Sequence, residues 1–161
     1  MSDRQPPQPS WDDQIDADVE SSLADMATIA VVGLSPNPER TSHRVTAYMQ
    51  QHGYRIVPIN PVAAGEEILG ERVYASVAEA QAARPDLEID TVNVFRRSVD
   101  TDRPIADAIA ARDGGVRTVW LQLGIVNRDG LRAAREAGLR AIEDRCLMVE
   151  HRRLVSTDQV R

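Results

Sequence analysis

The chain has 161 residues, 42% of them hydrophobic, and its 25 acidic and 19 basic residues give a formal net charge of −6. This length fits one domain with a sizeable core, and the acidic balance argues against a duplex nucleic-acid partner, whose phosphates require a dense positive face. All 19 basic residues are arginine, which excludes Schiff-base and P-loop chemistry because both need a lysine amine.

The cysteine and histidine content argues against a metal site. A single cysteine, Cys146, excludes an internal disulfide and a cysteine-based zinc site, and the three histidines His43, His52 and His151 lack metal-ligand spacing. No apolar run approaches 18 residues in length, and the polar, proline-rich N-terminus does not resemble a signal peptide. We therefore expect a soluble, cytoplasmic protein without a membrane partner.

Composition divides the chain into one domain and two tails. Residues 1–14 are expected to form a flexible N-terminal tail, with Trp11 as its one anchor, and residues 156–161 a C-terminal tail. Residues 15–155 form the single expected domain. Apolar side chains repeat at helical spacing from Asp16 to Met26, which predicts a short helix ahead of the first strand.

Five apolar runs then alternate with helix-length segments. The predicted strands are Ile29–Gly33, Arg55–Ile59, Thr91–Phe95, Thr118–Leu123 and Leu139–Ile142. The predicted helices between them are Ser42–His52, Val77–Ala83, Pro104–Arg112 and Arg128–Ala137. This alternation predicts an α/β fold with an open parallel five-stranded sheet and helices on both faces. The insert 62–76, with a short strand at 72–74, is expected to form a flap over the sheet edge.

The end of the first strand indicates a nucleotide site. The β-branched run Ile29–Val32 ends at Gly33, which allows a tight turn beneath a ligand, and Thr41 or Ser42 then serves as a helix cap. The positive N-terminal end of that helix favours phosphates. The loop lacks the further glycines of the dinucleotide fingerprint, so an ordinary strand-to-helix turn without a ligand stays open.

The other strand ends suggest what kind of nucleotide is bound. In an open parallel sheet, ligands bind beyond the carboxyl ends of the strands. The second strand ends in Asn60 and Pro61 rather than in the acidic residue that holds the ribose of NAD. Arg40, Arg44 and the pair Arg96 and Arg97 follow the first and third strands, which suits a ligand that carries several phosphates.

Five motifs in order resemble one family. They are VGLSPNPER (32–40), GYRIVPINP (53–61), VNVFRR (92–97), VWLQLGI (119–125) and DRCLMVEHRRL (144–154). The chain is similar to the small prokaryotic CoA-binding proteins over about residues 16–155. That family in turn resembles the CoA-binding domain of the succinyl-CoA synthetase α subunit. The resemblance implies a single Rossmann-like domain that binds coenzyme A without catalysis.

The resemblance also implies which residues meet the ligand. Gly33, Leu34, Ser35 and Arg40 would meet the phosphates, Asn60 and Pro61 would border the pantetheine and pyrophosphate, and Val94, Phe95 and Arg96 would line the adenosine side. Gln122 and Gly124 would approach from the fourth strand. Pro36, Arg44 and Cys146 complete the candidate coenzyme A site.

Several of these residues also have purely structural interpretations. Phe95 is equally suited to the core or to an adenine platform, and Trp120 in mid-strand favours the core. The amide of Gln122 is suited to binding the ligand or to satisfying loop backbone groups. The segment 150–154 predicts a solvated helix face, on which His151 has no recognisable catalytic partner.

Two other functions remain open from the sequence. An enzyme acting on a CoA thioester or a CoA-linked redox partner would use Cys146 as its nucleophile, because the adjacent Arg145 favours the thiolate. Cys146 follows the fifth predicted strand, on the side where the pantetheine thiol of a bound coenzyme A is expected to emerge. Two outcomes stay open: a mixed disulfide between the two thiols, or a buried Cys146 thiol that does not react. An NAD(P)-binding regulator is disfavoured by the missing glycines and acidic residue. The acyl group, the oligomeric state and any protein partner are not specified.

Overall fold

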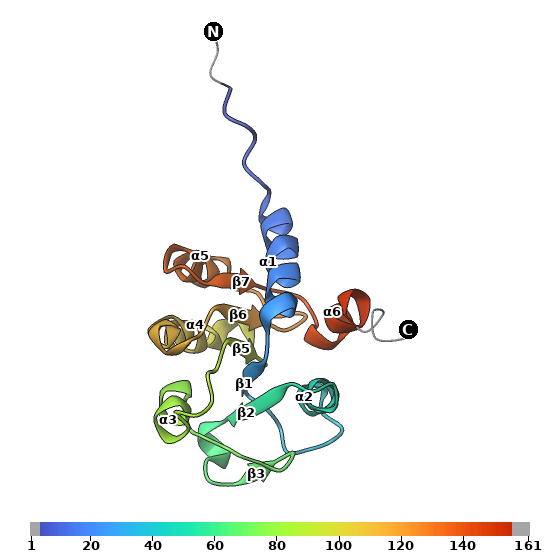
Figure 1. Cartoon of the computed structure of the whole chain (residues 1–161), viewed down its shortest axis with the longest axis vertical. Coiled ribbons are helices and arrows are strands. Elements are labelled where there is room, and N and C mark those ends of the chain that lie inside the picture. The colour runs from blue at the N-terminus through green and yellow to red at the C-terminus, as the bar shows by residue number, and fades with distance from the viewer. Residues whose placement is uncertain (1–3, 156–161) are drawn as a thin grey trace.

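The computed structural model describes residues 4–155 as a parallel sheet between two layers of helices (Figure 1). The α-helices are α1 (Trp11–Asp25), α2 (Thr41–Gln51), α3 (Val77–Ala83), α4 (Asp102–Ala110), α5 (Arg128–Glu136) and α6 (Leu147–Leu154). The strands are β1 (Thr28–Val32), β2 (Arg55–Ile59), β3 (Glu67–Ile68), β4 (Glu71–Arg72), β5 (Thr91–Val94), β6 (Thr118–Leu121) and β7 (Arg140–Ile142). Three short 3₁₀ helices are η1 (Pro61–Ala63), η2 (Ser98–Asp100) and η3 (Arg112–Gly114).

The main sheet has five parallel strands in the order β2-β1-β5-β6-β7. The predicted Rossmann-like α/β fold is therefore confirmed. The chain runs from β1 to β2 at one edge and then crosses back to place β5 on the other side of β1. This reversal of strand order lies between β1 and β5, and in open parallel sheets such a point is where ligands bind.

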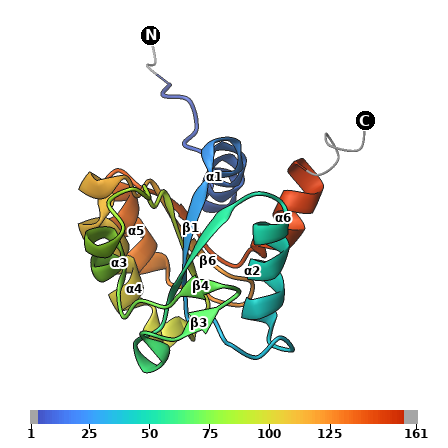
Figure 2. The same cartoon turned by 60° about the horizontal axis from the view of Figure 1, so that its bottom comes forward.

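Two separate apolar cores hold the helices against the sheet. Helices α3, α4 and α5 cover one face through residues such as Ile105 and Leu131, and helices α1, α2 and α6 cover the other face through residues such as Val19 and Met49. Figures 1 and 2 show these two groups on opposite sides of the strands. Trp120, predicted to be a core residue, is fully buried in the second core, and its indole N–H donates to the Arg145 carbonyl at 2.9 Å.

The first helix begins earlier than the sequence pattern predicts. It starts at Trp11 because Ser10 caps it, accepting from the backbone N–H of Asp13 at 3.0 Å. Residues 11–14, expected in the flexible tail, are therefore helical. The Trp11 indole donates to Glu143 at 3.0 Å and lies 5.0 Å from the guanidinium groups of both Arg128 and Arg135. The expected C-terminal tail, 156–161, lies outside the described residues.

Helix α1 also completes the edge of the sheet at β7. The Asp18 carboxylate accepts from the Ala141 backbone N–H at 3.0 Å and pairs with Arg135 at 2.9 Å. Asp25 forms a two-pronged ion pair with Arg140 at 2.9 and 2.6 Å, and that hydrogen-bonded arginine lowers the pKa of the Asp25 carboxyl. The edge of the sheet is therefore protected by side chains of a helix rather than by another strand.

The insert between β2 and α3 differs in detail from the expected flap. Instead of a strand at 72–74, it contains the short antiparallel hairpin β3–β4, and only Tyr74 forms a bridge with Ile59 of the main sheet. Tyr74 accepts from the Asn60 N–H at 2.9 Å and donates to the Pro58 carbonyl at 3.0 Å. The insert thus fixes the carboxyl end of β2, from which Asn60 and Pro61 emerge.

The C-terminal helix is solvated only in part: Arg152 and Arg153 are exposed as its charges predict, but His151 is not. His151 is fully buried, and its Nδ1 forms a 2.9 Å hydrogen bond with the hydroxyl of Tyr48 on α2. His52 and Tyr54 pack edge-on against the same imidazole. The prediction of a solvated face was wrong for His151, because the number of charged residues in a helix does not show which of its faces packs against another helix. In the described part of the chain, no helix is both long and apolar enough to cross a bilayer.

Candidate functional site

The carboxyl ends of β1 and β5 approach each other closely at Gly33. This residue has a φ of +85°, and a Cβ added to it would lie 2.6 Å from the Phe95 carbonyl oxygen. Its N–H donates to the Ile59 carbonyl at 2.9 Å, so that Gly33 joins the ends of three neighbouring strands. Only glycine allows this backbone approach, because a side chain would collide with the main chain of β5.

The loop after Gly33 uses its own backbone N–H groups internally. The N–H of Ser35 donates to Ser42 Oγ at 3.0 Å, and the N–H of Asn37 donates to Ser35 Oγ at 3.1 Å. The N–H groups of Glu39 and Arg40 both donate to Asn37, one to its side chain and one to its carbonyl. The loop therefore has a fixed shape, but it does not cradle an anion with these amides as a glycine-rich loop does.

The free backbone donors lie instead at the start of α2. Arg40 occupies the N-cap position and forms no side-chain cap hydrogen bond. The sequence predicted that Thr41 or Ser42 would cap this helix, which was wrong because the Ser42 hydroxyl accepts from Ser35 instead. The first-turn N–H groups of an α-helix have no partner within the helix, so this uncapped N-terminus presents donors and a positive dipole to the cleft.

Two arginines face this N-terminus without acidic partners. Within residues 4–155, no carboxylate lies at ion-pair distance from Arg40 or Arg96, whereas the neighbouring Arg97 pairs with Asp100 at 2.9 Å. Arg96 extends over Gly33, with its Nε 3.2 Å from the position of an added Cβ. The cleft between them has a volume of about 500 Å³. It is lined by Gly33, Ser35, Pro36, Arg40, Thr41, Ser42, Asn60, Phe95 and Arg96.

A second cavity adjoins the cleft on the other side of Arg96. It has a volume of about 300 Å³, and its wall combines apolar side chains such as Val32, Ile59 and Pro104 with the charged side chains of Arg96, Asp100, Arg103 and Asp107. Pro61 and Ser76 also line it. The two cavities share Arg96, so together they form a trough along the carboxyl ends of β2, β1 and β5, with one polar half and one half of mixed apolar and charged lining.

Asn60 shapes the border between these halves. Its side-chain oxygen accepts from the Val62 N–H at 3.1 Å and caps η1, while its Nδ2 lies 3.4 Å from the Leu34 carbonyl. Phe95 is half-buried, lining the cleft and packing against the core of α1, α2 and α6. Phe95 therefore packs partly in the core and partly on the wall of the cleft.

Six predicted site residues lie outside the lining of both cavities, and the first four of them are Leu34, Val94, Gln122 and Gly124. Leu34 and Val94 have fully buried side chains in opposite cores, so only their backbone atoms face the strand ends. The Gln122 side chain is buried and accepts from the Leu147 N–H at 3.3 Å, which is the structural interpretation of this residue. Gly124 is exposed, and its N–H donates to Asp144 at 2.7 Å.

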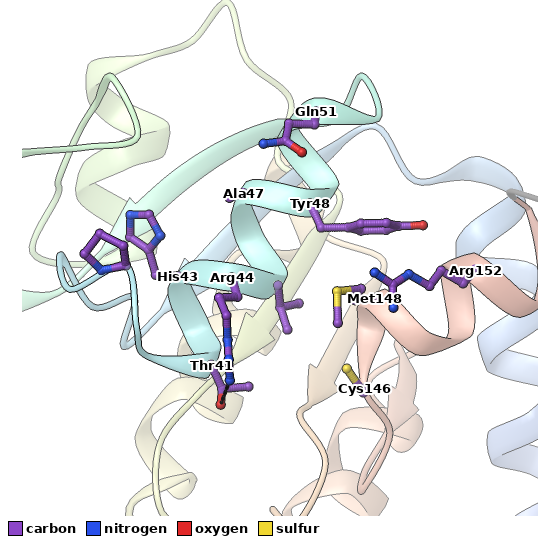
Figure 3. Close-up of a pocket in the computed structure, with 11 residues that line it drawn as sticks. Thr41, His43, Arg44, Ala47, Tyr48, Gln51, Cys146, Met148 and Arg152 are labelled. Atoms are coloured by element: carbon purple, nitrogen blue, oxygen red, sulfur yellow. Dashed lines mark hydrogen bonds between the residues drawn. The ribbon is translucent and has the colours of Figure 1, made fainter.

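Two further predicted residues line a different groove. Arg44 and Cys146 lie on a groove between α2 and α6, which is shown in Figure 3. The Cys146 side chain is only 9% exposed. His43 lines the same groove, but Figure 3 shows its ring on the far side of α2, directed away from Cys146. His43 and Cys146 therefore do not form a cysteine–histidine pair of the kind that activates a nucleophile.

The sequence interpretation missed three hydroxyl residues that line the trough. Thr41 and Ser42 were considered only as caps, although both line the cleft. Ser76, at the N-cap of α3, lines the second cavity. A signal was present in each case, because hydroxyl residues that begin helices at the carboxyl ends of strands lie at the ligand-binding edge.

Comparisons with known proteins identify the family. A protein-family model described as "CoA binding domain" matches residues 27–152. The chain is 39% identical over 135 residues to "Uncharacterized protein YneT" of Bacillus subtilis, covering 84% of this chain and 93% of that protein.

Solved structures of archaeal and bacterial proteins share the fold. A hypothetical protein from Pyrococcus horikoshii OT3 is 34% identical with a TM-score of 0.77, over 94% of this chain and 99% of that one. A protein from Thermus thermophilus is 38% identical with a TM-score of 0.74, over 86% and 98% of the two chains. The strand-end motifs, the cleft beside Gly33 and the family match lead to one conclusion: the chain belongs to the CoA-binding domain family.

Proposed function

We propose that the cleft at the carboxyl edge of the sheet binds coenzyme A, or a short acyl-CoA, and does not catalyse a reaction on it. One observation carries the proposal: two arginines without acidic partners and an uncapped helix N-terminus converge beside Gly33. In a protein with a net charge of −6, such a concentration of unpaired donors favours a diphosphate. Charge-assisted hydrogen bonds from arginine and helix-terminal amides are the usual means of holding phosphate.

The second cavity, which adjoins the cleft at Arg96, supports a ligand larger than a free phosphate. It shares Arg96 with the polar cleft and offers apolar side chains such as Val32 and Ile59. Its two aspartates, Asp100 and Asp107, are paired with Arg97 and Arg103. Coenzyme A combines a diphosphate with a long uncharged pantetheine arm, so its chemistry matches both halves of the trough. The family match favours the same ligand.

The residues of the cleft support binding rather than turnover. Its described lining contains hydroxyl, amide and guanidinium groups, but no Asp, Glu, His or Cys. The second cavity contains Asp100 and Asp107, and each forms an ion pair with an arginine, Arg97 or Arg103. The hydroxyl groups of Ser35 and Ser42 take part in the hydrogen bonds that fix the loop. Activating a hydroxyl nucleophile requires an adjacent base, and these side chains have none within the lining.

Thermal unfolding with different ligands tests the proposal. A ligand present at 100 times its Kd adds about 2.7 kcal/mol to stability, which raises the Tm of a domain of this size by about 5–10 °C. We expect this shift with coenzyme A and a smaller one with NAD or ATP. A larger shift with NAD than with coenzyme A would contradict the proposal.

Neighbouring arginines provide a matched mutational test. Arg40→Gln and Arg96→Gln should each weaken coenzyme A binding by about 10-fold or more, the effect of losing a charged hydrogen bond. Arg97→Gln is the control, because Arg97 is exposed and already paired with Asp100. Titration calorimetry measures the three affinities. Unchanged binding in both Arg40→Gln and Arg96→Gln would remove these arginines from the site.

A further inference from the structure

The layer formed by α1, α6 and α2 has a groove on each side of α6. Helix α6 lies between the other two helices and packs against both of them (Figures 1 and 2). The groove between α2 and α6, shown in Figure 3, has a volume of about 550 Å³. The groove between α1 and the end of α6 has a volume of about 420 Å³. This layer is therefore not smooth, and its two grooves differ in charge.

The groove between α2 and α6 is basic in an acidic protein. Arg44 lines it from α2 and Arg152 from α6, and the eleven described residues of its lining include no Asp or Glu. Within residues 4–155, no carboxylate lies at ion-pair distance from Arg44, whose guanidinium forms a long hydrogen bond of 3.5 Å to Thr41 Oγ1. Arg152 lies over the Tyr48 ring, 5.0 Å from its centre. The groove therefore favours an acidic occupant.

Helix α1, on the other side of α6, is acidic. Of its 15 residues, six are Asp or Glu and none is Lys or Arg. Asp12, Asp13, Asp16 and Glu20 are exposed, and Asp16 has only a loose contact of 3.7 Å with Arg145. Glu20 lines the groove between α1 and α6, and the other described residues of that lining are apolar. One side of α6 is therefore acidic and the other side basic.

This arrangement of charge makes the layer complementary to a second copy of itself. Two copies can face each other across a two-fold axis that runs along α6, so that α1 of each copy lies opposite α2 of the other. The acidic helix then meets the basic groove twice, because a two-fold axis repeats each contact. Val149 of α6 lies near this axis and is 49% exposed, and among the described residues of the layer it is the one exposed large hydrophobic side chain. An apolar centre with a charged rim is the usual composition of an interface.

We infer that the α1–α6–α2 layer is a homodimer interface, in which α1 of each copy covers the α2–α6 groove of the other. The net charge of −6 makes two copies repel each other at long range. Attraction must therefore come from the local separation of charge, which this layer provides. The inference does not rest on the proposed coenzyme A function, because Arg40 and Arg96 of the cleft do not line the groove.

An exchange of charge between two variants tests the inference by sedimentation velocity. The wild type should show a monomer–dimer equilibrium with a micromolar Kd, which should rise by about 10-fold or more between about 0.1 M and about 1 M NaCl because salt screens exposed charges. Arg44→Glu and Glu20→Arg should each be monomeric where the wild type is dimeric, because each reversal places like charges together at two symmetric contacts. An equal mixture of the two variants should form a heterodimer, because opposite charges then meet at both contacts.

A charge reversal in the opposite layer provides the control. Arg132→Glu changes an exposed arginine of α5 and should keep the wild-type Kd. The salt dependence of the wild type tests the inference even where a variant does not fold. A wild type that stays monomeric at about 1 mM would overturn the inference and leave the groove to an acidic segment of another protein. A dimer that persists in both Arg44→Glu and Glu20→Arg, or a mixture of the two that stays monomeric, would also overturn it.

Discussion

Gly33 is the residue whose identity the geometry constrains most. Its positive φ and the 2.6 Å distance from an added Cβ to the Phe95 carbonyl oxygen exclude a side chain. Gly124 has a nearly identical φ of +83° but open space around its Cβ position. We predict that Gly124→Ala costs about 1 kcal/mol through backbone strain alone. Gly33→Ala should cost about 1–3 kcal/mol more through overpacking.

Urea unfolding of the two glycine variants measures this difference, because the extrapolated free energies share one reference state. If both variants lost the same free energy of unfolding, the close contact between β1 and β5 at Gly33 would accommodate a methyl group without any further loss of stability. The same two variants separate an effect on ligand binding from an effect on stability, because of these two glycines only Gly33 lines the cleft.

The reactivity of Cys146 tests whether the thiol end of a bound coenzyme A lies near this residue. It lines the groove between α2 and α6, and it is only 9% exposed. Disulfide exchange needs an accessible thiolate and a nearby partner sulfur. We therefore predict no reductant-sensitive, CoA-sized mass increase when the protein is incubated with CoA disulfide and weighed intact. An adduct on the wild type that is absent from Cys146→Ser would place the thiol arm in the groove instead.

At the scale of elements, the packing of α6 against α2 depends on a neutral histidine. Burial lowers the pKa of His151 below its ordinary 6.5, and the nearby His52 lowers it further. The groups that pack around the imidazole are Tyr48, His52 and Tyr54. Below pH 6.5 the unfolded chain binds a proton that the folded protein does not. The stabilisation is therefore complete above pH 6.5 and is lost as the pH falls through the lowered pKa.

This linkage predicts a pH-dependent stability that is specific to one side chain. Wild-type unfolding free energy should fall between pH 8 and pH 5, and His151→Phe should reduce the fall because no imidazole is buried at that position. Tyr48→Phe removes the hydrogen bond but keeps the imidazole, so it should retain the pH dependence. Urea unfolding at the two pH values gives the comparison. An identical decline in the wild type and His151→Phe would assign the effect to other groups.

For the whole molecule, α1 is part of the fold rather than an appendage. It buries Ile15, Val19 and Leu23 against the sheet and α6, which at about 1.5–3 kcal/mol for each side chain amounts to about 5–9 kcal/mol. This approaches the entire stability of a domain. We predict that deletion of residues 1–8 leaves the Tm unchanged, while deletion of residues 1–25 prevents cooperative unfolding.

The point variant Ile15→Ala gives a graded measure of the same contribution. It should cost about 2–5 kcal/mol through a cavity and lost burial, as measured by urea unfolding. A cooperative transition with an unchanged midpoint after deletion of residues 1–25 would show that α1 does not contribute to the core.

The sequence by itself determined the class of fold and the edge that carries the site. Apolar runs such as Ile29–Val32 and Thr118–Leu121 are buried on both faces, so their pattern is local and predicts strands with only small errors at their ends. Gly33, Arg40, Asn60 and Arg96 follow such runs, so sequence order alone places them at one edge of a parallel sheet.

Only the tertiary structure decided which of these side chains share a cavity. Arg96 and Arg97 are equivalent in sequence, yet one lines the cleft and the other pairs with Asp100. Arg44 and Cys146, 102 positions apart, meet on one groove because α2 and α6 pack side by side, and the same packing buries His151. Side-chain direction and the pairing of distant helices depend on long-range packing, which local periodicity does not encode.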